Sequence, residues 1–290
     1  MGFADAIAGN GFALLAEVDP PKGADTTEFI DTVLSIRGRV DGVVVTDSAY
    51  GVMRMTPLAP ARLLMDRNVS PAVVLGTRDR NRHSFQGDLL GAWALGVREV
   101  VIREGGDPDH GDQPGAKSAR DLDLESALHC VTSLNSGKDA AGEPLQGHTD
   151  FVVGAALDVS DDDGFNRQVA DAMPMLAERG VRFAVLGPTY DMKILELLAD
   201  AAKKANVALF CSVMLLKSVS MIRYLDSLPG APNIPADYLA RMRKAPVKQQ
   251  AGLEIAAEFL AKAGDKCQGA VLHGLGWGAR LPEFLTLLGR

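Results

Sequence analysis

The chain has 290 residues, of which 47% are hydrophobic and 23% are charged, and its formal net charge is −7 with a pI near 5.3. This length and apolar content allow one large domain or two ordinary domains with a sizeable core. Lysine and arginine are scattered and are outnumbered by acidic residues, so nucleic acid is not expected as a partner.

The cysteines and the N-terminal residues indicate the expected environment of the protein. Cys130, Cys211 and Cys267 are widely spaced and form no motif with metal-ligand spacing, so neither a metal site nor a disulfide scaffold is expected. The first residues contain no basic segment followed by a long apolar run, so no signal peptide is expected. No apolar run is long enough for a membrane span. We therefore expect a cytoplasmic protein.

Short apolar runs recur along the chain, with helical periodicity between them. Most of these runs are continuous rather than alternating, as in strands that are buried on both faces. We expect eight strands, at residues 12–18, 41–46, 71–76, 98–103, 150–156, 182–187, 206–212 and 269–273. Eight βα units in a chain of this length predict a closed (β/α)8 TIM barrel, with residues 1–290 forming a single barrel domain.

Two helices and two insertions can be placed between these strands. One helix is predicted from Gly164 to Arg179, ending at Gly180. Another is predicted from Met192 to Ala205, with a buried face made of Leu195, Leu197, Leu198 and Ala202. Residues 135–149 are polar and glycine-rich, which is typical of a solvated loop. Residues 227–247, an insertion after strand seven with a short helix to Lys244, are expected to line one side of the barrel mouth.

The carboxyl ends of barrel strands converge on one face, and two acidic residues are placed there. Glu17 ends the first strand among apolar neighbours, where burial would raise its pKa and suit a general acid near neutral pH. A buried glutamate paired with backbone or with an arginine is an equal alternative. Asp107 follows the fourth strand after Gly105 and Gly106, in a loop that ends at Pro108 and can approach a ligand closely. It could instead cap the next segment.

Other polar residues near the strand ends favour structural roles. The run Arg78-Asp79-Arg80-Asn81-Arg82 lies between a strand and a helix, and most of its charges are typical of an ion-pair network that starts the helix. His273 on the last strand is more typical of a satisfied core histidine than of a catalytic base. Neither a Rossmann fingerprint nor a P-loop is present.

Several short segments, taken in their order and spacing, make the chain resemble the methylenetetrahydrofolate reductases. These segments cover most of the length, and the late ones are similar to the shorter bacterial reductases. They are residues 16–23, 45–48, 78–82, 86–92, 106–107, 111–114, 121–123, 216–218, 252–256 and 274–277.

The resemblance implies a (β/α)8 barrel that reduces 5,10-methylenetetrahydrofolate to 5-methyltetrahydrofolate. In this family hydride passes from NAD(P)H to FAD and then to the folate. The resemblance assigns Glu17 as the general acid that opens the folate ring and Asp107 as the acid beside the flavin. It also implies a set of cofactor-binding residues, namely Thr46, Asp47, Thr77, Arg78, Gly105, Gly106, Gln113, Pro114 and Ala119.

The second half of the chain departs from the family pattern. Gly187 replaces a glutamine that contacts folate and nicotinamide, and residues 173–176 replace a segment that directs cations at the flavin phosphates. Backbone N–H groups at helix N-termini could compensate for these cations. Three hypotheses follow: a flavin-dependent reductase with an iron–sulfur partner subunit or as a homo-oligomer, a flavin-free reductase with direct hydride transfer, or a non-catalytic barrel subunit.

Overall fold

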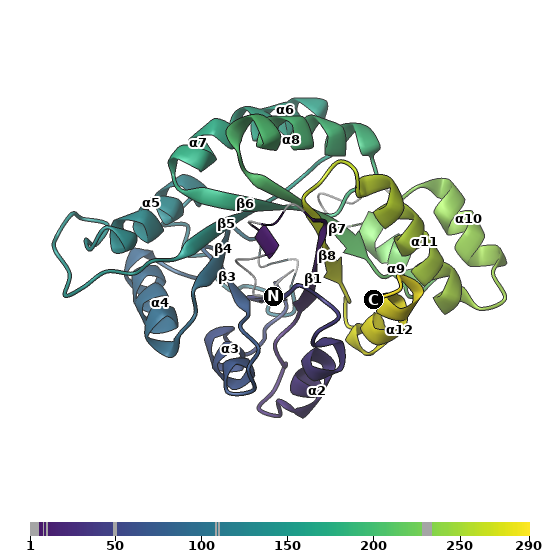
Figure 1. Cartoon of the computed structure of the whole chain (residues 1–290), viewed down its shortest axis with the longest axis horizontal. Helices are drawn as coiled ribbons and strands as arrows, with labels where there is room; N and C mark the ends of the chain where they lie inside the picture. The colour runs from purple at the N-terminus through teal and green to yellow at the C-terminus, as the bar shows by residue number, and fades with distance from the viewer. Residues whose placement is uncertain are drawn as a thin grey trace.

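The computed structural model describes residues 6–7, 9, 11–48, 51–107, 109, 111–227 and 234–290. Its strands form a closed barrel in which each strand pairs in parallel with the next and β8 pairs with β1 (Figure 1). The strands are β1 (Ala13–Val18), β2 (Gly42–Val45), β3 (Ala72–Gly76), β4 (Glu99–Arg103), β5 (Val152–Leu157), β6 (Val181–Leu186), β7 (Ala208–Met214) and β8 (Gly269–His273). The predicted (β/α)8 barrel is confirmed, with strand ends within two residues of those expected.

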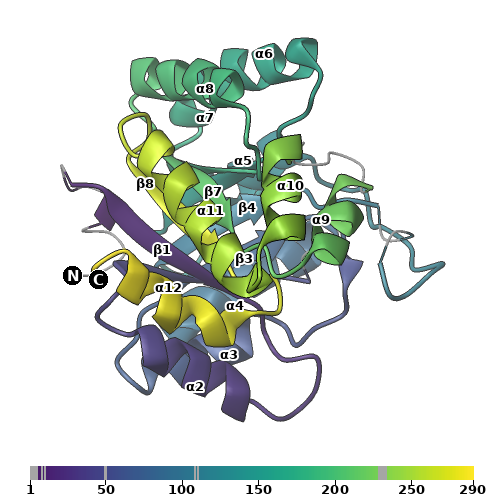
Figure 2. The same cartoon turned by 90° about the vertical axis from the view of Figure 1, so that its right-hand side faces the viewer.

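Helices surround the barrel on its outer side (Figure 2). They are α2 (Thr27–Ile36), α3 (Leu58–Met65), α4 (Arg82–Leu95), α5 (Leu124–Asn135), α6 (Asp163–Asp171), α7 (Met173–Glu178), α8 (Met192–Ala205), α9 (Val219–Asp226), α10 (Ala236–Lys244), α11 (Lys248–Ala263) and α12 (Leu281–Leu287), with a short 3₁₀ helix at Gly278–Arg280. The predicted short helix that ends at Lys244 is confirmed as α10. Residues 228–233 of that insertion lie outside the described residues.

Two helix predictions need correction. The segment predicted as one helix from Gly164 to Arg179 forms two helices, α6 and α7, separated at Ala172. Pro174 occupies the first turn of α7, and because proline lacks an N–H and clashes with the preceding turn it favours a break there. Leu197 of α8 is 37% exposed rather than buried, whereas the other predicted core residues of that helix are fully buried.

The polar insertion at residues 135–149 is a mostly exposed loop after α5, as predicted. A single antiparallel bridge joins Lys138 to Pro144. The backbone N–H of Ala140 donates to the side-chain oxygen of Gln86 on α4, at 2.7 Å. The loop is therefore held against the outside of the barrel, on the face of α4.

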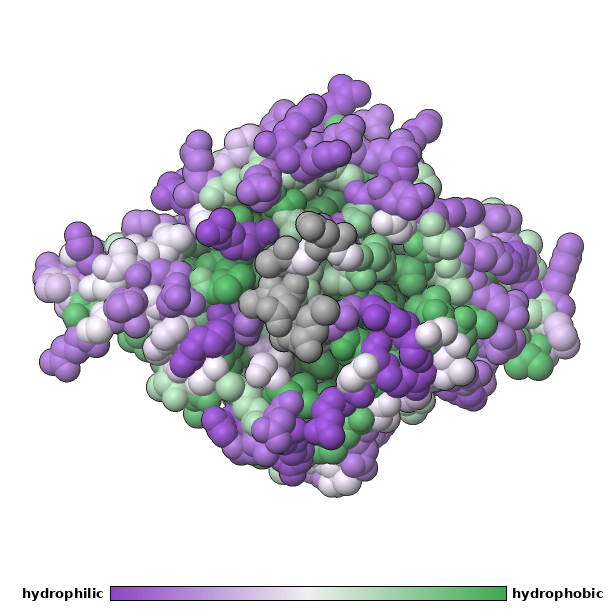
Figure 3. Space-filling view, viewed as in Figure 1, coloured by the Kyte–Doolittle hydropathy of each residue, from purple (hydrophilic) through white to green (hydrophobic). Residues whose placement is uncertain are grey.

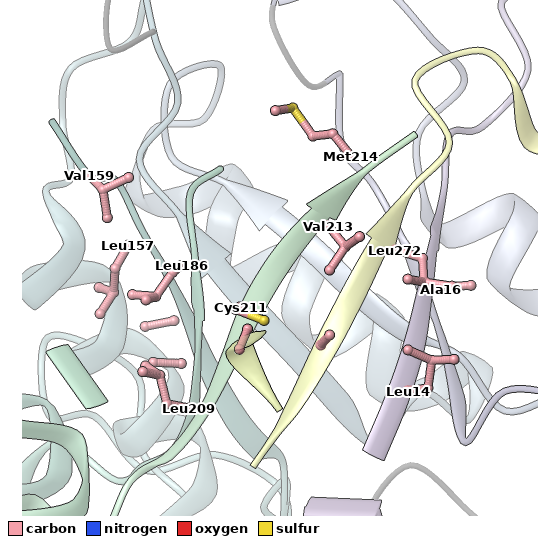
Figure 4. Packing of buried hydrophobic residues seen from close by; sticks show 14 of the residues in the cluster. Leu14, Ala16, Leu157, Val159, Leu186, Leu209, Cys211, Val213, Met214 and Leu272 are labelled. Atoms are coloured by element: carbon pink, nitrogen blue, oxygen red, sulfur yellow. The ribbon is translucent and has the colours of Figure 1, made fainter. Parts of the chain in front are cut away.

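Apolar side chains fill two layers, one inside the barrel and one between the sheet and the helices. Figure 4 shows part of the outer layer, including Leu14 on β1, Cys211 on β7 and Leu272 on β8. Inside the barrel, the rings of Phe183 and Phe210 pack edge to face with centroids 6.1 Å apart. Glycines on the neighbouring strands β5 and β8 make room for these rings. A Cβ atom at Gly154 would lie 2.3 Å from the ring of Phe183.

The surface of the barrel is hydrophilic around its rim. Figure 3 shows hydrophilic side chains gathered at the edge of the face viewed in Figure 1, with apolar residues closer to its centre. None of the described helices is long and apolar enough to cross a membrane.

The alternation of side chains along the strands determines which polar residues face the barrel interior. Leu15, Val101, Phe210 and Val271 belong to the interior cluster. Because strand side chains alternate with a period of two, the residue two positions later on each strand also faces inward, closer to the carboxyl end. Those residues are Glu17, Arg103, Ser212 and His273. The fold therefore places one acid, one arginine, one hydroxyl and one imidazole above the apolar interior.

Candidate active site

Closure of the barrel brings Glu17 and His273 together. Glu17 lies opposite His273 in the parallel pairing of β1 with β8. The Oε1 atom of Glu17 is 2.8 Å from Nδ1 of His273, and the two side chains are only 14% and 6% exposed. His273 is thus a buried, hydrogen-bonded histidine, as predicted from the sequence. Its partner at Nδ1, however, is the predicted catalytic acid.

Ser212 extends this contact into a chain of hydrogen bonds. Its Oγ atom lies 2.7 Å from Nε2 of His273 on the neighbouring strand. The same hydroxyl donates to the carbonyl oxygen of Leu186, the last residue of β6, at 2.5 Å. Ser212 was not among the site residues predicted from the sequence. The available signal was a polar residue at an inward-facing position of the otherwise apolar strand β7.

The predicted direction of the Glu17 pKa shift was wrong. Burial does raise the pKa of Glu17, but the positive charge of His273, its hydrogen bond to Glu17 and the charge of Arg103 together outweigh burial. The pKa of this carboxyl is therefore lowered below its ordinary value. Arg103 stands two residues beyond Val101 on β4, and its charge could not be assigned to Glu17 from the sequence because β1 and β4 are not neighbouring strands.

Asp107 lies at the same end of the barrel as Glu17, in the loop that follows β4. Its side chain is exposed, and its Oδ1 atom accepts a hydrogen bond from the backbone N–H of Asp109 at 3.0 Å. This contact is a local turn within the loop, which matches the alternative reading of Asp107 as a capping residue. Pro108, which was predicted to close this loop, lies outside the described residues.

The two acids line different cavities at this end of the barrel. Glu17 lines a cavity of about 570 Å³ together with Asp19, Arg54 and Trp277. Asp107 lines another, of about 480 Å³, together with residues of the β3 and β4 loops. A third cavity, of about 490 Å³, contains Arg103 and Gly187 in its lining.

Thr46 and Asp47, predicted to contact a cofactor, both bond to other parts of the protein. The hydroxyl of Thr46, which is 1% exposed, donates to Oδ1 of Asp19 at 2.8 Å. Asp47 accepts a hydrogen bond from the backbone N–H of Gly76 at 2.9 Å and forms an ion pair with Arg80. Arg80 also binds Asp88 of α4 at 2.7 Å, which bears out the predicted ion-pair network at the start of this helix.

Thr77 and Arg78 connect the end of β3 to the loop after β4. The backbone N–H of Thr77 donates to the carbonyl oxygen of Arg103 at 2.9 Å, and that of Arg78 to the carbonyl oxygen of Glu104 at 3.0 Å. The Arg78 side chain is 10% exposed, and its Nε atom donates to Asp79 Oδ1 at 2.9 Å. The guanidinium of Arg78 is thus already paired with a carboxylate.

The glycine-rich loop after β4 packs closely against Arg78. Gly105 has a φ of 88°, a conformation that favours glycine, and a Cβ atom there would lie 3.1 Å from Cβ of Arg78. Gly106 has open space beside it. Gln113 and Pro114 are exposed, and the backbone N–H of Ala119 donates to the carbonyl oxygen of Arg78 at 2.8 Å.

Backbone N–H groups in this loop could bind phosphates only if they were not already bonded within the protein. The N–H of Gly115 donates to Oδ1 of Asp109 at 3.0 Å, and that of Asp112 to the carbonyl oxygen of Gly51 at 3.3 Å. Within the loop from Gly105 to Pro114, the N–H groups of Asp109 and Asp112 are therefore already bonded inside the protein.

Three of the helix N-termini at this end of the barrel carry negative charge. α5, α6 and α8 each begin with an aspartate whose side chain accepts backbone N–H groups of the first turn, namely Asp123, Asp162 and Asp191. A phosphate at these positions would compete with a carboxylate for the same donors and would be repelled by its charge. The expected compensation by helix N-termini is therefore not available at these three helices.

The cavity that contains Gly187 is predominantly acidic. Its lining includes five acids and two arginines, namely Asp47, Asp79, Glu104, Asp158, Asp162, Arg78 and Arg103. The backbone N–H of Gly187 donates to Leu157 O at 2.7 Å, and the residue has no side chain with which to contact folate. The acidic lining therefore disfavours a diphosphate in this cavity.

Comparisons with known proteins agree with the barrel and with the sequence resemblance. A family model described as methylenetetrahydrofolate reductase matches residues 3–275. A crystal structure of 2,3-dimethylmalate lyase, a PEP mutase/isocitrate lyase superfamily member, matches with a TM-score of 0.53 at 12% identity, covering 98% of this chain and 84% of that one. A crystal structure of a long-chain alkane monooxygenase matches with a TM-score of 0.55 at 11% identity, covering 97% and 92%. These two likenesses show the fold alone. No curated protein sequence matches the chain.

Proposed function

The chain belongs to the methylenetetrahydrofolate reductase family, and we propose that it reduces 5,10-methylenetetrahydrofolate to 5-methyltetrahydrofolate with Glu17 as the general acid. Family membership supports a folate-related oxidoreductase. The observation that carries the proposal is the contact between Glu17 and His273, which places a proton-bearing pair at the carboxyl end of the barrel, where barrel enzymes hold their active sites.

The proposed reaction requires one proton and one hydride. The methylene carbon joins two nitrogens of a five-membered ring. A proton delivered by Glu17 to one of these nitrogens allows its bond to the methylene carbon to break, which leaves an iminium between the methylene carbon and the other nitrogen. Hydride then adds to the methylene carbon and forms the methyl group. NAD(P)H supplies the hydride and leaves as NAD(P)⁺, so each turnover consumes one proton, which the Glu17 site must recover from solvent.

FAD is the predicted hydride carrier because the family generally binds it. FAD, if bound, would supply hydride transfer between the nicotinamide and the folate. The acidic lining of the Gly187 cavity and the carboxylates that cap three nearby helices favour a second candidate, in which the nicotinamide transfers hydride directly to the folate without a flavin. Asp107 remains the predicted acid beside the flavin.

Location and partners complete the proposal. The three cysteines are free thiols, which supports a reducing, cytoplasmic location. An iron–sulfur partner subunit or a second copy of the chain stays a prediction from the resemblance. A non-catalytic barrel subunit stays a separate hypothesis.

The test is an absorbance spectrum and an assay on the purified full-length chain. Flavin absorbance that bleaches with NADH or NADPH and recovers with 5,10-methylenetetrahydrofolate would support the flavin route. A colourless protein that oxidises NADH or NADPH while forming 5-methyltetrahydrofolate would support direct transfer. Formation of no 5-methyltetrahydrofolate with either donor, with or without added FAD and an iron–sulfur partner, would contradict the proposed activity.

A further inference from the structure

The hydroxyl of Ser212 determines where His273 carries its ring protons. Ser212 Oγ lies 2.5 Å from the carbonyl oxygen of Leu186, and a carbonyl can only accept, so the serine proton must point to Leu186. The same oxygen lies 2.7 Å from Nε2 of His273 and can therefore only accept from it. Nε2 of His273 must carry a hydrogen.

This assignment fixes the proton count of the contact with Glu17. The separation of 2.8 Å between His273 Nδ1 and Glu17 Oε1 requires one hydrogen between the two atoms. Because Nε2 already holds its own hydrogen, a hydrogen on Nδ1 makes His273 a cation beside the Glu17 carboxylate. If the hydrogen is instead on the carboxyl group, His273 is neutral. In both arrangements the pair holds one exchangeable proton.

Loss of this proton would leave two acceptors facing each other. The Nδ1 lone pair of neutral His273 would then lie 2.8 Å from the Glu17 carboxylate, with no hydrogen between them. A histidine that could move its remaining hydrogen to Nδ1 would avoid this arrangement, but the bond from Ser212 to Leu186 holds that hydrogen on Nε2. We infer that Ser212 and His273 are positioning residues that keep one proton on the Glu17 pair, so that the acid is ready for each turnover.

The charged groups around the pair are consistent with this role. Within the described part of the chain, β4 contributes Arg103, whose positive charge acts on Glu17, and β7 and β6 contribute the neutral Ser212 hydroxyl and Leu186 carbonyl. In the cavity that Glu17 lines, Asp19 and Arg54 face each other at 3.5 Å and offset each other in charge. The inference rests on the proposed function, because the proton is the one that opens the folate ring.

The proton positions can be measured without any assay of activity. Nuclear magnetic resonance of wild-type protein labelled with ¹⁵N-histidine, with His273 assigned from the His273→Asn spectrum, reports which ring nitrogens carry hydrogen. We expect a hydrogen on Nε2 throughout the neutral pH range. A His273 ring with hydrogen on Nδ1 and none on Nε2 would overturn the inference, whether or not the protein reduces folate.

Two variants and one control then test the effect on turnover. Ser212→Ala frees the ring hydrogen to move to Nδ1, so we expect the pH at which folate reduction declines to move downward. The amide introduced by His273→Asn can still donate a hydrogen bond to Glu17, but it cannot release a proton. The pair then holds no exchangeable proton, and we expect a loss of roughly 10²-fold in kcat. The control is His129→Asn, at an exposed histidine of α5, which should match wild type.

The outcomes separate this inference from the proposed function. A wild-type pH profile in Ser212→Ala together with a wild-type kcat in His273→Asn, in a protein that reduces folate, would overturn the positioning role and leave the proposed function intact. A wild-type protein that forms no 5-methyltetrahydrofolate would contradict the proposed function, while the ring-proton measurement would still test the geometry of the pair.

Discussion

The Nδ1 atom of His273 lies 2.8 Å from the carboxylate of Glu17, although 256 residues separate the two in the chain. The pairing of the first strand with the last closes the barrel, and the same pairing creates this contact. The proposed catalytic acid therefore has its histidine partner only in the closed fold. The site and the closure of the barrel depend on the same register of β1 against β8.

The ion pair between Arg80 and Asp47 should contribute strongly to stability. These side chains are 11% and 9% exposed, so Arg80→Met would leave Asp47 buried without its charged partner. We expect a loss of about 3–5 kcal/mol in the free energy of unfolding, measured by urea denaturation. Arg62→Met is the matched control, since its pair with Asp66 is 43% and 50% exposed and should contribute much less to stability. Equal losses in the two variants would contradict this account.

The aromatic packing inside the barrel should not tolerate a methyl group at Gly154. A Cβ atom there would lie 2.3 Å from the ring of Phe183, so Gly154→Ala should destabilise the fold by roughly 1–3 kcal/mol. Phe183→Leu in the same chain should restore part of that loss. Gly87→Ala on α4, where a Cβ meets nothing within 4 Å, should instead stabilise by about 0.5–1 kcal/mol. Thermal and urea unfolding measure the stability of each variant. A Gly154→Ala protein that is as stable as wild type while Phe183 is unchanged would refute the packing argument.

Glu99 at the start of β4 should make stability depend on pH. Burial raises the pKa of Glu99, and the charge of Arg98 offsets only part of this effect. The folded state therefore favours the protonated form of Glu99. The resulting stabilisation is complete below the pKa of Glu99 in the unfolded chain, about 4.3, and is lost as the pH rises through the higher pKa of the folded state. Glu99→Gln should therefore be more stable than wild type at neutral pH, with the difference vanishing in acid. A difference in melting temperature that is independent of pH would contradict the argument.

The barrel could be predicted from the sequence because its signals are local. Continuous apolar runs such as Ala72–Gly76 are typical of strands buried on both faces, and their number and spacing indicated closure. The break between α6 and α7 was not predicted because the helical periodicity continues across it, although Pro174 favours a break there. The exposure of Leu197 was missed because α8 buries a narrower face than its apolar residues suggest.

The site could be predicted only in part because its electrostatics are not local. The position of Glu17 at a strand end could be read from the sequence, whereas the direction of its pKa shift depends on His273 and Arg103, which come from other strands. Thr46, Asp47 and Arg78 carry side chains suited to a cofactor, but their partners Asp19, Arg80 and Asp79 occupy them in the fold. Whether these side chains are available to a cofactor depends on partners that only the three-dimensional fold brings beside them.

The measurement that tests the central claim most directly is the rate of 5-methyltetrahydrofolate formation by Glu17→Gln. Glutamine keeps the shape of the side chain but cannot deliver a proton, so we expect a loss of roughly 10²- to 10⁴-fold relative to wild type. The matched control is Glu99→Gln, which neutralises a buried glutamate that begins a barrel strand instead of ending one, and it should retain the wild-type rate. If Glu17→Gln forms 5-methyltetrahydrofolate at the rate of the control, Glu17 is not the acid of this reaction.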